Sequence, residues 1–122
     1  MCIRDRAELL RRQDRRADAV KLYKELASDV RTKEGSAAAY YVLEDVFAGG
    51  DMDKAEKAIF AYSEREPQAY WLAKAFILLG DVYVRKGDNF QARATYQSVA
   101  DGYSPADDGI VAEAKERIAK LN

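Results

Sequence analysis

The sequence predicts an all-helical protein, and three observations support this fold class. Of the 122 residues, 48% are hydrophobic and 34% are charged, which is the composition of a chain that folds. Only two prolines and seven glycines occur, while residues that favour helices are plentiful. Apolar residues recur at intervals of three and four, and no stretch alternates with a period of two. We therefore expect helices and no strands.

The apolar periodicity divides the chain into successive helices. Apolar stripes cover residues 19–30, 36–48, 52–62, 68–86, 92–103 and 110–121. The stretch 68–86 is apolar nearly all round, which is typical of a helix packed on several sides. With a shortened leading helix near residue 7, about seven helices are expected.

Helix-breaking residues lie between these stretches. They are Gly35, Gly49-Gly50-Asp51, Pro67, Gly87-Asp88 and the segment 102–109. We expect Pro67 in the first turn of the helix that follows it, where its missing N–H costs nothing. Residues 104–107, Ser-Pro-Ala-Asp, could form a capping box at the start of the last helix.

One spacing pattern recurs along the chain, in which a small residue is followed by a large residue four and seven positions later. It occurs at Ala19, Tyr23 and Leu26, at Ala55, Ile59 and Tyr62, and at Ala92, Tyr96 and Val99. The three alanines are 36 and 37 residues apart. Small residues are needed where two helices nearly touch, and large ones fill the space beside them. The pattern indicates a repeated helix pair.

These residues resemble the tetratricopeptide repeat, a helix-turn-helix unit of about 34 residues. The unit 68–104 carries the motif most fully, at Phe76, Leu79, Gly80, Tyr83, Gly87, Ala92 and Tyr96. The unit 35–67 keeps Gly50, Ala55 and Pro67, and the unit 7–34 is degenerate, with Leu10, Ala19, Tyr23 and Leu26. The resemblance implies a right-handed α-solenoid of three units, with 105–122 as a polar C-terminal capping helix.

Two narrower resemblances concern origin and compartment. Segments 31–35, 68–73 and 86–92 resemble the C-terminal part of large tetratricopeptide proteins of Bacteroidetes-type bacteria. The chain's ending resembles cell-envelope tetratricopeptide proteins involved in outer-membrane assembly. These resemblances imply the bacterial cell envelope or periplasm if a signal was lost upstream, and the cytoplasm otherwise. Residues 1–6 resemble the adapter-derived start found on proteins translated from assembled environmental sequence reads. We therefore expect a non-native or frayed start, and the alternative is a charged helix start.

The sequence contains few candidate residues for catalysis or metal binding. The chain has no histidine, and its one cysteine, Cys2, excludes an internal disulfide and a thiolate zinc site. The nearest carboxylate pairs are Asp51 with Asp53 and Asp107 with Asp108. Both pairs lie at expected helix starts, where acidic side chains cap N–H groups. We expect neither an enzyme, nor a cofactor, nor a metal site.

The charge and hydropathy patterns do not favour binding to nucleic acid or insertion into a membrane. Twenty basic residues against twenty-one acidic ones give a net charge of −1. Residues 1–33 carry ten Lys and Arg against six Asp and Glu, so a contact of residues 4–33 with nucleic acid is a weaker alternative. Carboxylates interleave with these arginines, which is typical of a solvated helix face. No apolar run approaches the roughly 18 residues that span a bilayer, so no membrane insertion is expected.

The tetratricopeptide resemblance also implies a binding surface. The first helices of such units line a concave face that binds peptides, and the matching positions are Tyr40, Glu44, Phe47, Tyr70, Lys74, Ile77, Asp81 and Arg85. Glu44 and Asp81 stand where family members that clamp a terminal carboxylate have asparagine, so we expect such a group to be repelled.

We therefore expect a non-catalytic module that binds a peptide or protein segment. The alternative is a structural spacer, a fragment of a longer envelope protein that helps to assemble other proteins. Weak self-association through the truncated N-terminal end, around Leu9, Leu10, Val20 and Tyr23, is a further expectation.

Overall fold

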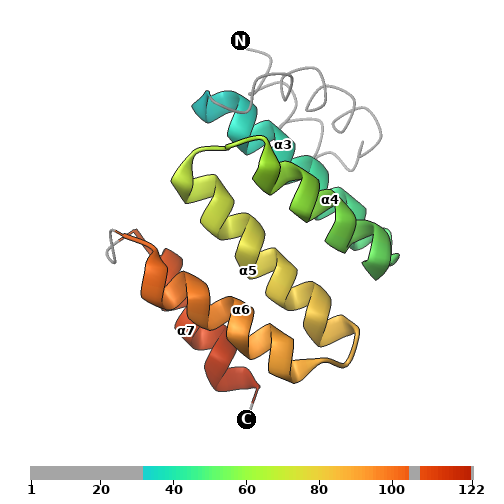
Figure 1. Cartoon of the computed structure of the whole chain (residues 1–122), viewed down its shortest axis with the longest axis vertical. Helices are drawn as coiled ribbons and strands as arrows, with labels where there is room; N and C mark the ends of the chain where they lie inside the picture. The colour runs from blue at the N-terminus through green and yellow to red at the C-terminus, as the bar shows by residue number, and fades with distance from the viewer. Residues whose placement is uncertain (1–31, 105–107, 122) are drawn as a thin grey trace, which may run out of the picture.

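A computed structural model describes residues 32–104 and 108–121 of the chain. These residues form five α-helices, α3 (Lys33–Ala48), α4 (Met52–Glu64), α5 (Ala69–Arg85), α6 (Asn89–Gly102) and α7 (Ile110–Lys120), and no strand (Figure 1). The prediction of an all-helical protein is confirmed for this part. The expectations for residues 1–6, for the unit 7–34 and the basic segment as far as Arg31, and for self-association around Leu9, Leu10, Val20 and Tyr23 lie outside the described residues.

The helix ends follow local signals that the sequence contains. Asp51 begins α4 by accepting a hydrogen bond from the backbone N–H of Lys54 at 3.1 Å, and Asp88 begins α6 in the same way through Gln91 at 3.0 Å. Gly50 and Gly87 precede these caps with φ of 91° and 79°, the left-handed region in which glycine is favoured. The predicted breaks at residues 49–51 and 87–88 are confirmed.

Three predicted helix boundaries are wrong. Gly35 lies inside α3, because Thr32 accepts a hydrogen bond from the Gly35 N–H at 2.9 Å and begins the helix earlier. Pro67 precedes the N-cap of α5, which is Gln68, and therefore lies outside the first turn. Helix α7 has Gly109 as its N-cap and therefore begins after the predicted capping box, of which residues 105–107 lie outside the described residues.

The helices form two layers, and α5 is the helix that contacts all the others (Figure 1). Consecutive helices are joined by short connections and pack side by side. In addition, α5 contacts both α3 and α7, so these three helices form one layer. Helices α4 and α6 pack against α5 and form the other layer. No helix in residues 32–104 or 108–121 combines the length and the apolar character needed to cross a membrane.

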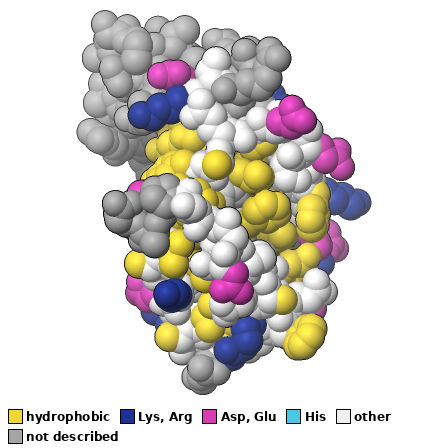
Figure 2. Space-filling view, turned by 60° about the vertical axis from the view of Figure 1, so that its left-hand side comes forward, with side chains coloured by type: hydrophobic (Ala, Val, Ile, Leu, Met, Phe, Trp, Pro, Cys, Tyr) yellow, Lys and Arg dark blue, Asp and Glu magenta, His cyan; other side chains and the backbone are white. Residues whose placement is uncertain are grey.

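Helix α5 supplies the largest share of the core. Its buried residues are Trp71, Ala73, Ala75, Ile77, Leu78, Leu79, Gly80, Val82 and Tyr83, which lie on several sides of the helix as its sequence predicts. Hydrophobic side chains also reach the surface, where Figure 2 shows them gathered across the middle of the molecule among charged side chains. The large exposed ones are Phe60, Tyr70, Val84 and Phe90.

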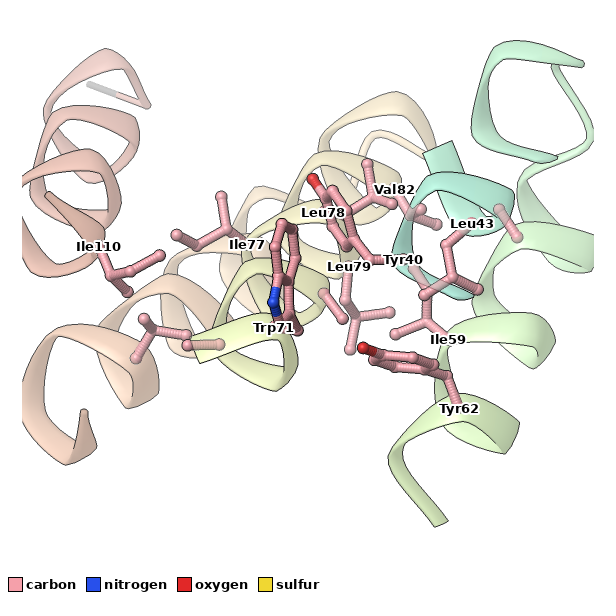
Figure 3. Close-up of a cluster of buried hydrophobic side chains, with 14 of the residues drawn as sticks. Tyr40, Leu43, Ile59, Tyr62, Trp71, Ile77, Leu78, Leu79, Val82 and Ile110 are labelled. Carbon is pink, nitrogen blue, oxygen red and sulfur yellow. The ribbon is translucent and has the colours of Figure 1, made fainter. Parts of the chain in front are cut away.

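Two small residues of the repeat pattern, Ala55 and Ala92, are described, and both lie at helix contacts. Ala55 and Ala92 are buried, and Tyr96, four positions after Ala92, is only 1% exposed. A Cβ atom built on Gly80 would lie 2.2 Å from the Tyr96 ring, so α5 and α6 approach each other closely at this point. Figure 3 shows the core on both sides of α5, with Ile59 and Tyr62 on one side and Ile110 on the other.

Candidate protein-binding surface

The eight predicted binding residues lie on two helices of one layer. Helix α3 carries three of them and α5 carries five: Tyr40, Glu44 and Phe47, and Tyr70, Lys74, Ile77, Asp81 and Arg85. Within each helix they are three or four positions apart, which places them on one side. Two contacts between the helices bring them together: Lys74 with Tyr40, and Arg85 with Phe47.

The first group of these residues is an aromatic cluster around Trp71. The Trp71 ring lies 5.6 Å from the ring of Tyr40, 5.8 Å from that of Tyr41 and 5.0 Å from that of Tyr70. The Lys74 ammonium lies over two of these rings, 5.6 Å from the centre of Tyr40 and 5.8 Å from that of Tyr70. Such cation–π contacts hold the amine over the cluster. Tyr70, which is 37% exposed, is the member that most clearly meets solvent.

Two of the predicted residues are packing residues. Tyr40 is 6% exposed and Ile77 is 3% exposed, with Ile77 on the side of α5 that faces α7 (Figure 3). Burial raises the pKa of the Tyr40 hydroxyl, and the neighbouring Glu44 carboxylate raises it further by charge and hydrogen bonding. A residue that binds a partner must reach solvent, and Tyr40 does so very little, because Trp71 and Lys74 cover its ring.

The second group surrounds Asp81. Its carboxylate accepts hydrogen bonds from the Tyr96 hydroxyl and from Nε of Arg117, the latter at 3.1 Å. Arg117 is also 3.4 Å from Glu113. Because Arg117 lies against Asp81, the carboxylate raises the pKa of the guanidinium. The expected repulsion of a carboxylate by Glu44 and Asp81 stays a prediction, and Arg117 offsets the charge of Asp81.

A hollow of about 310 Å³ lies beside Asp81, between the C-terminal ends of α5 and α7. It is lined by Phe47, Asp81, Val84, Arg85, Tyr96, Arg117, Lys120 and Leu121. Arg117 and Lys120 already form ion pairs with carboxylates, so Arg85 is the cation of this lining that lies against apolar surface, next to Phe47, Val84 and Leu121. The Arg85 guanidinium lies 5.0 Å from the centre of the Phe47 ring. The hollow can therefore take an acidic group that is attached to an apolar one.

The contribution of α7 to this hollow was not predicted. Its charged residues were assigned to an outward-facing cap, and Lys115, Glu116 and Lys120 are indeed exposed. Arg117 instead reaches back to Asp81, which lies 36 positions earlier in the chain. The repeat spacing could have predicted this contribution. Helix α7 follows α6 as α5 follows α4, so α7 takes the place of a first helix, and the first helix of each pair contributes to this face.

Three of the four carboxylates considered for chemistry have structural partners, and the fourth, Asp107, lies outside the described residues. Asp51 caps α4, and Asp53 lies 2.7 Å from the Lys86 ammonium, which lowers the pKa of the Asp53 carboxyl. Asp108 accepts hydrogen bonds from the Tyr103 hydroxyl and from the Ile110 N–H. Within residues 32–104 and 108–121, no three side chains of the metal-binding types are grouped to hold an ion.

The likeness to the tetratricopeptide repeat is carried by residues of this chain alone. No protein-family model, curated protein or solved structure matches the chain significantly. The residues that carry the likeness in the described part include Ala55, Gly80, Ala92 and Tyr96, and all four are buried at contacts between helices.

Proposed function

We propose that this chain is a non-catalytic protein-binding module, built as a right-handed solenoid of tetratricopeptide-like units. It binds a peptide or protein segment on the face formed by α3, α5 and α7. The observation that carries the proposal is the hollow between α5 and α7, in which Arg85, Arg117 and Lys120 stand beside Phe47 and Leu121. An apolar pocket with a few converging charged groups is typical of a recognition site.

The exposed residues of the face define the kind of segment that fits. Tyr70 and Lys74 lie near the N-terminal end of α5, and Arg85 lies at its C-terminal end. From Tyr70 to Arg85 the helix rises about 22 Å, which an extended segment of about seven residues spans. Such a segment would place an apolar side chain against Tyr70 and an acidic one beside Arg85.

A spacer role is the second candidate function, and the burial of Tyr40 and Ile77 favours it. Both residues fill contacts between helices instead of presenting side chains to a partner. Under this reading the aromatic cluster serves packing, and the chain holds other domains apart. The two functions predict different results for exposed residues of the same face.

A random peptide library displayed on phage and selected on the full chain tests the proposal. We expect enrichment of peptides that combine an aromatic or large aliphatic residue with Asp or Glu. The double variant Tyr70→Ala with Arg85→Ala should retain its helicity, because both side chains are exposed, and should lower the affinity for selected peptides by about thirtyfold.

Lys57→Ala provides the matched control, because Lys57 is exposed on α4, in the other layer. Its affinity for the selected peptides should equal that of the unchanged protein. If no peptide is enriched, or if the double variant binds selected peptides as tightly as the control does, the face is not a binding site and the spacer role is favoured.

A further inference from the structure

A second surface of the molecule carries an apolar furrow. A hollow of about 630 Å³ lies between α4 and α6, with α5 as its floor, and we call it the α4–α6 furrow. Its apolar lining comes from Phe60, Phe76, Leu79, Tyr83 and Phe90. A neighbouring hollow of about 280 Å³ shares Phe76 and Ser98 with it and continues to Leu72 and Tyr103. The two hollows therefore form one track along α6.

Two phenylalanines of the furrow are exposed to an unusual degree. Phe90 is 84% exposed and Phe60 is 43% exposed. With the 37-residue offset that relates Ala55 to Ala92, Phe90 corresponds to Asp53 and Phe60 corresponds to Gln97. The other copy of the helix pair thus folds with a polar residue at each position. Packing of the helices does not require these two aromatics, and a large exposed apolar patch marks an interaction surface.

The length of the track suits a helix of a few turns. Phe90 and Tyr103 lie at its two ends, and the rise of α6 between them is about 20 Å. An amphipathic helix of about 14 residues covers this distance with its apolar face. A furrow walled by two helices and floored by a third fits such a helix, whose anchors recur at three and four positions.

The charges around the furrow favour a basic partner. Among the described residues that line the track, the one ionised side chain is Asp88. Tyr83, on the floor, donates a hydrogen bond to Glu56 at 2.8 Å. Lys86 lies 2.7 Å from Asp53 and 3.0 Å from Glu56, so its positive charge is neutralised by two carboxylates. This end of the furrow therefore attracts cations.

We propose that the α4–α6 furrow binds an amphipathic helix of another protein, with an apolar stripe that contacts Phe60, Phe76 and Phe90 and with Lys or Arg beside that stripe. This site is separate from the α3–α5–α7 face, which has different residues, opposite local charge and an extended ligand. The partner's apolar residues occupy the furrow, and its basic residues lie near Asp88 and Glu56.

The probe is a fluorescein-labelled synthetic helix of about 14 residues, with Leu at helical spacing and Lys at the remaining positions. Fluorescence anisotropy with the full chain measures its affinity. Phe90→Asp and Phe60→Gln give each position the residue of the other helix pair, and circular dichroism should show unchanged helicity for both. Each variant should weaken binding about tenfold or more. A peptide with Glu in place of Lys should bind more weakly, with a difference that shrinks as salt is added.

Val84→Gln is the matched control, because Val84 is an exposed apolar residue of the α5–α7 hollow. It should leave the affinity for the helical probe unchanged. The double variant Tyr70→Ala with Arg85→Ala should also leave it unchanged, so a failure at this site can be told apart from a failure of the α3–α5–α7 face. The proposal is overturned if the probe does not bind, or if it binds the Phe60 and Phe90 variants as tightly as it binds the unchanged protein.

Two other occupants of the furrow give distinct results, and each of them overturns the proposal. If a second copy of the chain occupies it, sedimentation equilibrium shows a dimer of the unchanged protein that Phe90→Asp dissociates. If residues 1–31 occupy it, a nitroxide attached to Cys2, the sole cysteine, broadens the nuclear magnetic resonance signals of Phe60 and Phe90.

Discussion

Gly80→Ala tests the close approach of α5 and α6, on which the assignment of the repeat depends. The added Cβ would lie 2.2 Å from one carbon of the Tyr96 ring and 2.6 and 2.7 Å from two others. Carbon atoms in contact are normally about 3.5–4.0 Å apart, so the ring or the helix must move by more than about 1 Å. The ring is 1% exposed and its hydroxyl is bound to Asp81, so it has little freedom to move away.

The expected cost follows from two opposing effects. Extra volume in a well-packed core costs about 1–3 kcal/mol. Alanine favours a helix over glycine by about 0.8–1 kcal/mol, which offsets part of that cost. The contact of 2.2 Å places this substitution in the upper half of the first range, so we expect a net loss of about 1–2 kcal/mol in the free energy of unfolding. Such a loss lowers the melting temperature by several degrees.

Thermal and urea unfolding followed by circular dichroism measure this loss. Gly102→Ala is the matched control, because Gly102 also lies in a helix and a Cβ there meets no atom within 4 Å. It should leave the protein equally stable or slightly more stable. In the double variant Gly80→Ala with Tyr96→Leu, the two losses should not add, because the smaller side chain makes room for the methyl group. Equal stability of the Gly80 and Gly102 variants would refute the reasoning.

Three further predictions concern other sites. Ala92→Leu should destabilise the protein by about 1–3 kcal/mol because Ala92 is fully buried, whereas Ala94→Leu, at an exposed position, should change the melting temperature little. Glu66 has φ of 57°, so Glu66→Gly should raise the urea midpoint by relieving about 1 kcal/mol of backbone strain, and an unchanged midpoint would contradict this. Burial raises the pKa of the Tyr62 and Tyr96 hydroxyls in the folded state above the ordinary value of 10.0, so their contribution to stability is complete below pH 10 and is lost as the pH rises above it. Tyrosinate absorbance and loss of helicity should therefore rise together, and ionisation of these tyrosines with full helicity would contradict the assignment.

The helices could be predicted where their signals are local. The all-round apolar pattern of residues 68–86 indicates a central helix because a helix with neighbours on several sides needs apolar residues on several sides. Asp51 and Asp88 mark helix starts because the capping carboxylate accepts a hydrogen bond from the backbone N–H three residues later. Such contacts depend on neighbours in the sequence and are therefore visible in it.

Boundaries set by distant contacts could not be predicted. The start of α5 lies after Pro67, where the N–H of Gln68 donates to the hydroxyl of Ser36 at 3.0 Å, 32 positions earlier. The Ser36 carbonyl in turn accepts a hydrogen bond from Tyr62 at 2.8 Å. These hydrogen bonds join residues of different helices, so spacing within one helix cannot predict them.

The candidate site was predicted in part for the same reason. Residue spacing places Tyr40 and Lys74 on the right helices, since the side of a helix on which a residue lies depends only on its register. The exposed fraction of Tyr40 depends on Trp71, which belongs to another helix. The pairing of Asp81 likewise depends on Arg117, which belongs to α7.

Comparison of the two helix pairs separates packing from recognition. Positions related by the 37-residue offset are buried in both pairs at Ala55 and Ala92, Ile59 and Tyr96, and Tyr62 and Val99. All six are apolar or aromatic, because the same helix contact must be filled in each pair. The related positions Asp53 and Phe90 are exposed in both pairs and differ in chemistry, and so do Phe60 and Gln97. A residue that the fold does not require is free to serve a partner, and for this reason the exposed phenylalanines, rather than the larger set of buried aromatics, are the residues from which binding at the α4–α6 furrow is inferred.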